Sequence, residues 1–146
     1  MDITLIPVRE EDRHFFRRVH HESYRDTIES IFTWDDAEQD RFADADFDHR
    51  NPQIILCGDE KCGIVGIQDK GDHIRFGPIW LLPSFQGRGI GTYVVRLFMD
   101  QALREKRPLK LQTLKVNLRA KHLYERLGFL TTGSGDIYWD MEYAPI

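Results

Sequence analysis

The sequence predicts a mixed α/β domain of the α+β type, in which a mostly antiparallel sheet is combined with helices. Two short apolar runs, 53–57 and 62–68, flank a glycine-containing turn and are typical of an antiparallel hairpin. Apolar residues recur at helical spacing from Ile90 to Phe98. They alternate strictly from Ile137 to Tyr143, as in a strand with one buried face. Both kinds of element therefore occur in one chain.

The remaining elements follow from the same periodicities and from their boundary residues. Acidic residues at Glu10-Glu11-Asp12 suit the first turn of a helix, and Pro108 ends the helix that begins at Ile90. Asn117 is a suitable N-cap and Gly128 a suitable C′ residue for a short helix between them. The segment 24–48 predicts one more helix and a loop. We expect further strands over residues 3–8, 73–82, 109–116 and 129–132, the last paired with 137–143.

The strand expected over 73–82 contains a change of phase. Ile74 and Phe76 share one face, Ile79 and Leu81 would share the other, and Gly77-Pro78 stands at the switch. A one-residue phase change is what a β-bulge produces, and proline inside a strand favours a bulge or an edge. We therefore expect a bulge at this point.

Composition restricts the classes of function. The chain has 146 residues, which suits one domain over 1–146 with its own core. Its net charge is −4 and no basic cluster stands apart from acidic neighbours, which disfavours nucleic-acid binding. No apolar run approaches the ~20 residues that span a bilayer, and the N-terminus lacks the pattern of a signal peptide. We expect a cytoplasmic protein without membrane association, either a monomer or a homodimer.

The cysteines and histidines give no metal site. Cys57 and Cys62 flank the expected hairpin turn, where they could face each other, but free thiols in a reducing compartment are the favoured interpretation. Neither cysteine has histidines at metal-ligand spacing. The pair His20-His21 is interpreted as a polar helix surface.

The stretch from Leu81 to Thr92 is the strongest functional signal. An apolar strand ends at Pro83, glycines follow at 87, 89 and 91, and a helical pattern then begins. Glycine permits positive φ, and the amides at a helix start are free to bind an anion, so this order predicts a phosphate-binding turn. A P-loop would need a lysine that is absent, and a dinucleotide fingerprint would need glycine where Thr92 stands.

Two motifs carry a resemblance to a known family. Gln86-x-x-Gly89-x-Gly91 resembles the pyrophosphate loop of the GCN5-related N-acetyltransferases, the GNAT superfamily. Downstream, the segment from Asn117 to Phe129 resembles the second signature of that family, N-x-x-A-x-x-L-Y-x-x-x-G-F. The motifs occur in the family's order and at a family-like separation, and the resemblance is most specific over residues 74–130.

The resemblance implies a GNAT fold, with helices on both faces of a sheet that splays at a bulged central strand so that acyl-CoA can enter. It implies acetyl-CoA, or coenzyme A, as co-substrate, no metal, and transfer of the acetyl group to a primary amine of a small molecule or peptide by direct attack. The residues implied in coenzyme binding are Trp80, Leu81, Leu82, Gln86, Gly87, Arg88, Gly89, Ile90, Gly91, Thr92, Asn117, Ala120 and Tyr124.

Roles in chemistry are implied for fewer residues. The hydroxyl of Tyr124 would protonate or hydrogen-bond the departing thiolate, although a tyrosine here also packs a helix on the sheet. The backbone N–H of Leu81 is expected to polarise the thioester carbonyl. Asn117 combines a capping role with a contact to coenzyme A. Tyr24 and Trp34 are expected to line the acceptor pocket, or else to belong to the core.

The general base is left open by the sequence. Many members of the superfamily carry a glutamate on the strand before the glycine turn, whereas this strand has only Asp72, His73 and Arg75 near its start. Glu22, Glu29 or a chain of waters could serve instead. The missing carboxylate supports an alternative function, a non-catalytic module that binds or senses acyl-CoA on the same fold. A dinucleotide-binding domain is disfavoured, because the glycine turn follows several antiparallel strands.

Overall fold

The computed structural model describes residues 1–145, except for the side chain of Tyr24. The chain divides into two compact units. The first comprises Met1–Ile67 and Pro78–Gly91, and the second comprises Gln68–Gly77 and the chain from Thr92 onward. The chain therefore crosses from one unit to the other three times, and each unit is described by itself.

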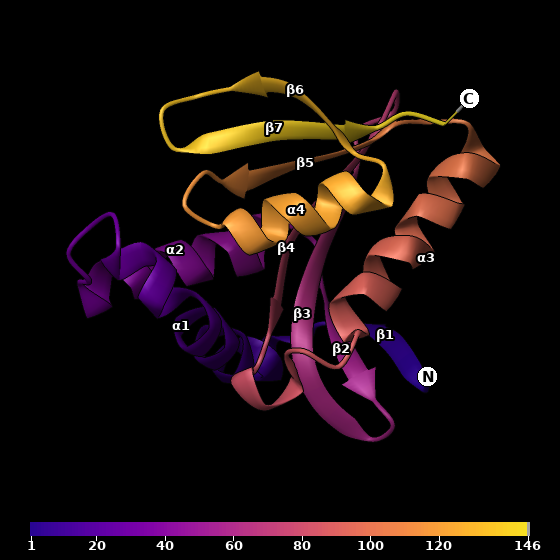
Figure 1. Ribbon diagram of the computed structural model, residues 1–146. Coiled ribbons are helices and arrows are strands. Elements are labelled where there is room, and N and C mark those ends of the chain that lie inside the picture. Colours follow the sequence, from indigo (N-terminus) through magenta and orange to yellow (C-terminus); the bar gives the residue numbers. More distant parts are fainter. Residues whose placement is uncertain (146) are drawn as a thin grey trace. The chain divides into compact units, whose positions relative to one another are not determined.

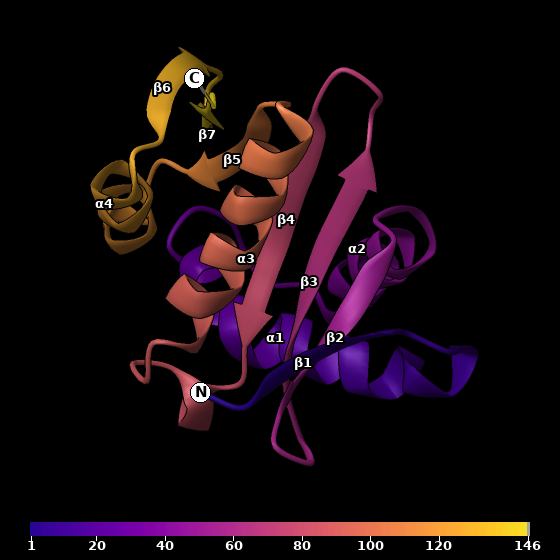
Figure 2. The same cartoon turned by 90° about the vertical axis from the view of Figure 1, so that its right-hand side faces the viewer.

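The first unit contains an antiparallel sheet. Its strands are β1 (Ile3–Pro7), β2 (Pro52–Cys57) and β3 (Glu60–Asp69), which lie side by side in Figure 2. The β2–β3 hairpin turns at Gly58-Asp59, as expected, and its register shifts between Ile55 and Leu56. Its core includes Ile54, Ile55 and Val65, each with no exposed surface. Burial of such β-branched side chains supplies the main stabilisation of these strands.

Two helices complete the first unit. A 3-10 turn at Glu10–Asp12 precedes α1 (Arg13–Glu29), and α2 (Asp36–His49) begins after Asp35, whose carboxylate accepts the Glu38 N–H at 3.1 Å. The two helices lie side by side (Figure 1) and make ring contact through Phe16 and Phe47, with centroids 5.4 Å apart. The segment 24–48 thus yields the helix and loop expected from the sequence.

The second unit is formed by α3 (Ile90–Glu105, from Thr92 onward), β5 (Leu109–Leu114), α4 (Leu118–Leu127), β6 (Leu130–Ser134) and β7 (Tyr138–Tyr143). Strand β7 pairs antiparallel with both β5 and β6, and Figure 1 shows the three side by side. Leu109, Met141 and Phe129 are almost fully buried and form the apolar centre of the unit. Met141 is the buried residue of the alternating last strand.

Strand β4 (Ile74–Leu81) begins in the second unit and ends in the first. Ile74 and Phe76 are each 1% exposed, and Gly77 then adopts a φ of 109°, at the expected change of phase. Positive φ at a glycine is the conformation used in one common type of bulge. In the described residues β4 pairs with β5, in parallel, only at Ile74–Leu109 and Arg75–Lys110. The described β4–β5 ladder therefore covers only the start of β4, within the second unit.

The seven strands hydrogen-bond in the order β1-β2-β3-β4-β5-β7-β6, a mixed and mostly antiparallel sheet. The expected elements are all present, with one difference at the first helix. The three acidic residues expected in its first turn form a 3-10 turn instead, in which the N–H of Asp12 donates to the carbonyl of Arg9, three residues back, at 2.9 Å. Within residues 1–145, no helix has the length and apolar character needed to cross a membrane.

Candidate functional site

The glycine turn of the first unit is held at both of its ends. The N–H of Leu82 donates to the carbonyl of Cys62 at 2.9 Å, which ties the end of β4 to β3. A short 3-10 turn follows at Pro83–Phe85, and the ring of Phe85 is buried. The side-chain amide of Gln86 then donates to the carbonyl of Leu81 at 3.0 Å. This bond closes the turn and accounts for the glutamine of the first motif.

The turn itself is exposed and rests on glycine conformations. Gly87 and Gly89 have φ values of 75° and 81°, and a Cβ atom at either would meet no backbone within 4 Å. The glycines are therefore required by backbone conformation, since an L-residue pays a penalty at positive φ. Ile90, 1% exposed, anchors the start of α3 directly after the turn. The first amides of α3 have no intrahelical partner, so the turn presents donors to an anion.

The carboxyl end of β4 lies unusually close to β3. A Cβ atom added at Gly63 would stand 2.3 Å from the carbonyl oxygen of Trp80 and 2.8 Å from a methyl carbon of Leu81. Only glycine permits this approach. The sequence analysis did not single out Gly63, although a glycine inside an apolar strand is a recognised signal of close backbone contact.

The second motif lies on α4 in the second unit. The Asn117 side chain accepts the N–H of Ala120 at 3.1 Å, and Gly128 ends the helix at a φ of 104°. Both caps agree with the sequence prediction. Tyr124 is 7% exposed, its ring packs on Phe129 at 5.5 Å, and burial raises the pKa of its hydroxyl to about 12. The hydroxyl is therefore protonated and able to donate a hydrogen bond throughout the physiological pH range.

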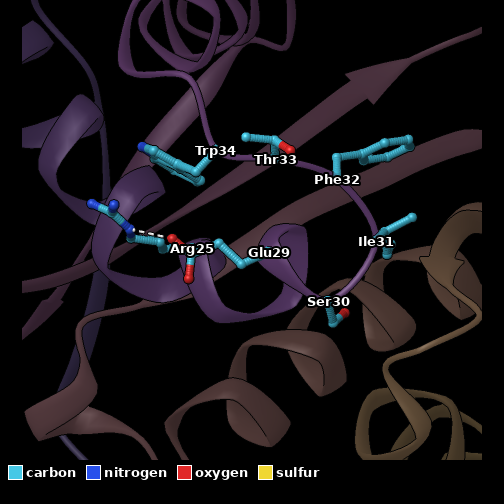
Figure 3. Close-up of a pocket in the computed structure, with 7 residues that line it drawn as sticks. All are labelled: Arg25, Glu29, Ser30, Ile31, Phe32, Thr33 and Trp34. Carbon is cyan, nitrogen blue, oxygen red and sulfur yellow. Dashed lines mark hydrogen bonds and ion pairs between the residues drawn. The ribbon is translucent and has the colours of Figure 1, made fainter.

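The region expected to form the acceptor pocket contains an open hollow of about 470 Å³ (Figure 3). It is lined by the end of α1 and the loop after it, namely Arg25, Glu29, Ser30, Ile31, Phe32, Thr33 and Trp34. The Arg25 guanidinium lies 5.1 Å from the Trp34 ring centre and donates to Glu29 at 2.8 Å. Trp34, which the sequence left either at the acceptor pocket or in the core, lines this hollow. The expected role of Tyr24 concerns a side chain outside the described part of the structure.

The histidine pair on α1 differs from its sequence interpretation. His20 is 2% exposed, so it is not part of a polar helix surface. The nitrogen Nδ1 of His20 lies 2.9 Å from Nδ1 of His21, and Nε2 of His21 lies 2.7 Å from Oδ1 of Asp40 on α2. The apolar periodicity of α1 did not predict the burial of His20, because histidine is classed as a polar residue. The position of His20 directly after Val19, which is buried, did not indicate that His20 is buried as well.

The two glutamates considered as bases are both engaged. Glu22 accepts from Arg18 at 2.6 Å, and Glu29 accepts from Arg25 at 2.8 Å, each on the exposed side of α1. Each glutamate therefore already has an ion-pair partner on its own helix.

The cysteines are free, as expected. Cys57 is half-buried and pairs in register with Glu60, while Cys62 is buried, so the two do not face each other across the hairpin. Burial raises the pKa of the Cys62 thiol to about 11. Among residues 1–145 no group of three histidine, cysteine or acidic side chains is placed to hold a metal ion.

The residues expected to bind coenzyme fall into two groups. The first unit holds those of the strand end and the turn, from Trp80 to Gly91, and the second holds Thr92, Asn117, Ala120 and Tyr124. Within each unit the expected neighbours lie together: the turn follows β4 directly, and Asn117 is the N-cap of the helix that contains Ala120 and Tyr124.

These features are matched in known proteins. The chain belongs to the acetyltransferase (GNAT) family, whose model matches residues 10–129. Spermidine N(1)-acetyltransferase of Escherichia coli (strain K12) is 30% identical over 84 residues, which cover 55% of this chain and 45% of that protein. The chain thus spans less than half the length of the curated relatives that it matches.

Solved structures share the fold at low identity. The PaiA N-acetyltransferase of Thermoplasma acidophilum in complex with coenzyme A superposes with a TM-score of 0.80, at 13% identity and 99% coverage of each chain. The ribosomal-protein-S18-alanine N-acetyltransferase of Escherichia coli gives a TM-score of 0.72, at 17% identity, with 98% of this chain and 94% of that chain covered.

Proposed function

We propose that this chain is an acetyl-CoA-dependent N-acetyltransferase whose acceptor is a primary amine, and that residues 1–146 act as one acetyltransferase domain. The observation that carries the proposal is the exposed turn from Gln86 to Gly89 at the start of α3. Its two glycines have positive φ, and the start of a helix follows directly, which supports a role for the backbone amides here in binding an anion. Membership of the family supports the pyrophosphate of coenzyme A as that anion.

The strand end before the turn would bind the rest of the coenzyme. Backbone groups of Trp80, Leu81 and Leu82 would pair with the pantetheine amides in the manner of an added strand. The N–H of Leu81 would donate to the thioester carbonyl as negative charge develops on its oxygen. The position of these residues directly before the turn, on a strand held to β3 by the Leu82–Cys62 bond, supports this assignment.

Tyr124 would assist departure of the thiolate by donating a hydrogen bond. Its pKa of about 12 lies well above the ~8.5 of an ordinary thiol, so complete proton transfer to the thiolate is uphill. A hydrogen bond to the thiolate needs no such transfer and still lowers the energy of the leaving group. Asn117 and Ala120 would contribute to coenzyme binding from the first turn of α4.

Direct attack of the amine on the thioester is favoured over an acyl-enzyme. The thiolate is the nucleophilic form of cysteine, and the raised pKa of buried Cys62 keeps that residue as the thiol. The spermidine acetyltransferase relative and the net charge of −4 both support a cationic amine as the acceptor class. The hollow beside Trp34 is the candidate acceptor site.

The first experiment is thermal unfolding with acetyl-CoA, coenzyme A, NAD and ATP in parallel. A ligand at ~100 times its Kd adds about 2.7 kcal/mol, which raises Tm by about 5–10 °C in a chain of this size. We expect a shift with the two CoA species only. Thiol release with spermidine, free amino acids and an alanine-terminated peptide then tests turnover.

The two measurements together distinguish a transferase from a module that only binds acyl-CoA. A CoA-specific shift together with amine-dependent thiol release supports the transferase. A CoA-specific shift without release from any amine supports the alternative, a module that binds or senses acyl-CoA, which the lack of a carboxylate on β4 favours. An equal shift with NAD contradicts both.

A further inference from the structure

We propose that the side chain of Arg25 occupies a cation-binding site in the hollow beside Trp34, and that a second positive charge on the acceptor displaces it. Glu29 and Trp34 would bind this second charge, remote from the amine that reacts, and Arg25 would select against acceptors that lack it. The inference rests on the proposed transferase function, which supplies the cationic acceptor. All three residues line the hollow and lie in the first unit.

The Arg25 guanidinium already makes the two contacts that a bound cation needs. Its Nε donates to Oε1 of Glu29 at 2.8 Å, and its central carbon lies 5.1 Å from the centre of the Trp34 ring (Figure 3). A carboxylate beside an aromatic face binds ammonium and guanidinium groups through charge and through the ring quadrupole. The arginine of the chain itself therefore marks where in the hollow a cation is stable.

The Trp34 ring is fixed by contacts that do not involve Arg25. Its Nε1–H donates to Oδ1 of Asp36 at 2.7 Å. The ring also packs perpendicular to that of His21, with centroids 5.3 Å apart. The aromatic wall of the hollow would therefore stay in place when Arg25 moves away from it.

The charges around the hollow favour a cation over an anion. The pKa of Arg25 is raised, mainly by its hydrogen bond to Glu29 and further by the charges of Glu29, Asp36 and Asp26. One cation is thus acted on by three carboxylates. The first unit has 16 acidic and nine basic residues, a net charge of −7, against −4 for the whole chain. This potential attracts a cationic acceptor and repels an anionic one.

Arg25 is held loosely enough to be displaced. Its side chain is 55% exposed and that of Glu29 is 45% exposed. An exposed ion pair between residues four apart on a helix adds little stability, since water solvates both charges well. The long arginine side chain can turn into solvent without any change in α1. A ligand cation therefore has only a weak competitor to replace.

The hollow lies near the proposed reaction site of the same unit. The rings of Trp34 and Trp80 both contact the ring of His20, with centroids 6.5 and 4.9 Å from it. Trp80 directly precedes Leu81, the proposed donor to the thioester carbonyl. An acceptor with two amines would place one at the strand end while the other, as an ammonium, occupies the hollow.

The test compares two acceptors of equal length, 1,4-diaminobutane and 4-aminobutan-1-ol, which differ in the charge of the remote end. Wild type should have the lower KM for the diamine. Arg25→Gln should lower that KM about 5-fold, because the competing cation is gone, and Glu29→Gln should raise it about 5-fold. Neither variant should change kcat, and neither should change the KM of the amino alcohol.

Matched controls exclude a general effect of charge. Arg18→Gln removes an exposed arginine of α1 that is paired four residues on, with Glu22, outside the hollow. Glu11→Gln removes an exposed carboxylate before α1. Both controls should keep the wild-type KM for each acceptor. Acetyl-CoA should raise Tm equally in every variant, and the exposure of the substituted side chains makes loss of folding no obstacle.

Tetramethylammonium tests the hollow without the reaction. It has no N–H and cannot accept an acetyl group, yet aromatic faces bind it. The indole N–H signal of Trp34 in an NMR spectrum, assigned by its loss in Trp34→Phe, should shift on its addition. Arg25→Gln should reach the half-maximal shift at about 5-fold lower concentration than wild type, and Arg18→Gln at the wild-type concentration.

The outcomes distinguish the cation site from the function on which it rests. An Arg25→Gln variant that raises the KM of the diamine, or changes both acceptors equally, overturns the role of Arg25 while the transferase stands. Wild-type protein that turns over no amine overturns the proposed function. In that case a Trp34 signal that responds more readily in Arg25→Gln still supports the cation site, and a signal that does not respond overturns it as well.

Discussion

The carbonyl oxygen of Trp80 lies so close to Gly63 that a Cβ atom on residue 63 would be 2.3 Å from it. That distance is shorter than a van der Waals contact. Strand β3 therefore has no side chain where it passes the end of β4. The obstructing atom belongs to the backbone, so it cannot rotate out of the way as a side chain could. Gly63 thus fixes the position of the strand end that we propose binds the pantetheine arm.

The substitution Gly63→Ala should lower the free energy of unfolding by about 1–3 kcal/mol, the usual cost of overpacking a filled site. It should also weaken acetyl-CoA binding, because the backbone of Trp80 and Leu81 must move. Urea unfolding and calorimetric titration measure the two effects. Gly135→Ala is the control, since a Cβ atom there meets nothing within 4 Å. Unchanged binding in a destabilised Gly63→Ala would show that the strand end does not hold the coenzyme.

The substitution Gly89→Ala should separate conformational strain from ligand binding. An L-residue at a φ of 81° costs about 1–2 kcal/mol, and the amides of the turn would move with it. Gly71→Ala is a matched control, since Gly71 has a φ of 86° and open space around it. We expect similar losses of stability from both, with weaker acetyl-CoA binding from Gly89→Ala alone. Equal affinities would contradict the proposed pyrophosphate site.

The substitution Tyr124→Phe should lower kcat about 10- to 100-fold, the value of one hydrogen bond to a charged group. Because the pKa of Tyr124 is about 12, the hydroxyl does not ionise in the working range. The ratio of wild-type to variant rates should therefore be constant from pH 7 to pH 10. A ratio that falls with pH would indicate a proton donor of lower pKa. Tyr138→Phe, on β7, is the control.

The capping role of Asn117 can be separated from any role in binding. Asn117→Ala should lower the free energy of unfolding by about 1 kcal/mol, while Asn117→Ser retains a cap and should cost little. If Asn117 also contacts coenzyme A, both variants should bind acetyl-CoA more weakly. Full affinity in the serine variant would leave Asn117 with its structural role alone.

Stability at acidic pH should depend on His20. Its pKa is about 4 in the folded protein and about 6.5 when exposed, so the stability present above pH 6.5 is lost as the pH falls toward 4, where only the unfolded chain binds the proton. The loss is on the order of 2–3 kcal/mol. Urea unfolding from pH 7 to 4 should show a shallower decline for His20→Gln than for wild type. His14→Gln should decline as wild type does, and parallel curves for all three would contradict the burial of His20.

Local sequence patterns predicted most of the fold because they act over short distances. The turn at Gly58, the cap at Asn117 and the positive φ at Gly128 each depend on a few neighbouring residues, and the structure has each as expected. The positive φ at Gly77 lies where the sequence predicted a change of phase, because strand side chains alternate with a period of two. The 3-10 turn at Glu10–Asp12 was missed, because a 3-10 turn at a helix N-terminus shares the acidic residues and the capping box of an α-helix start.

By itself, the sequence determined the class of fold and the position of the glycine turn, since both depend on glycine spacing and apolar periodicity within short segments. Only the tertiary structure decided that His20 is buried beside Trp80 and that Asp40 joins His21. Likewise, the need for glycine at position 63 arises from a strand that follows about 17 residues later. Such relationships arise when packing brings together residues that are distant in the sequence. They cannot be predicted from the spacing of residues along the chain.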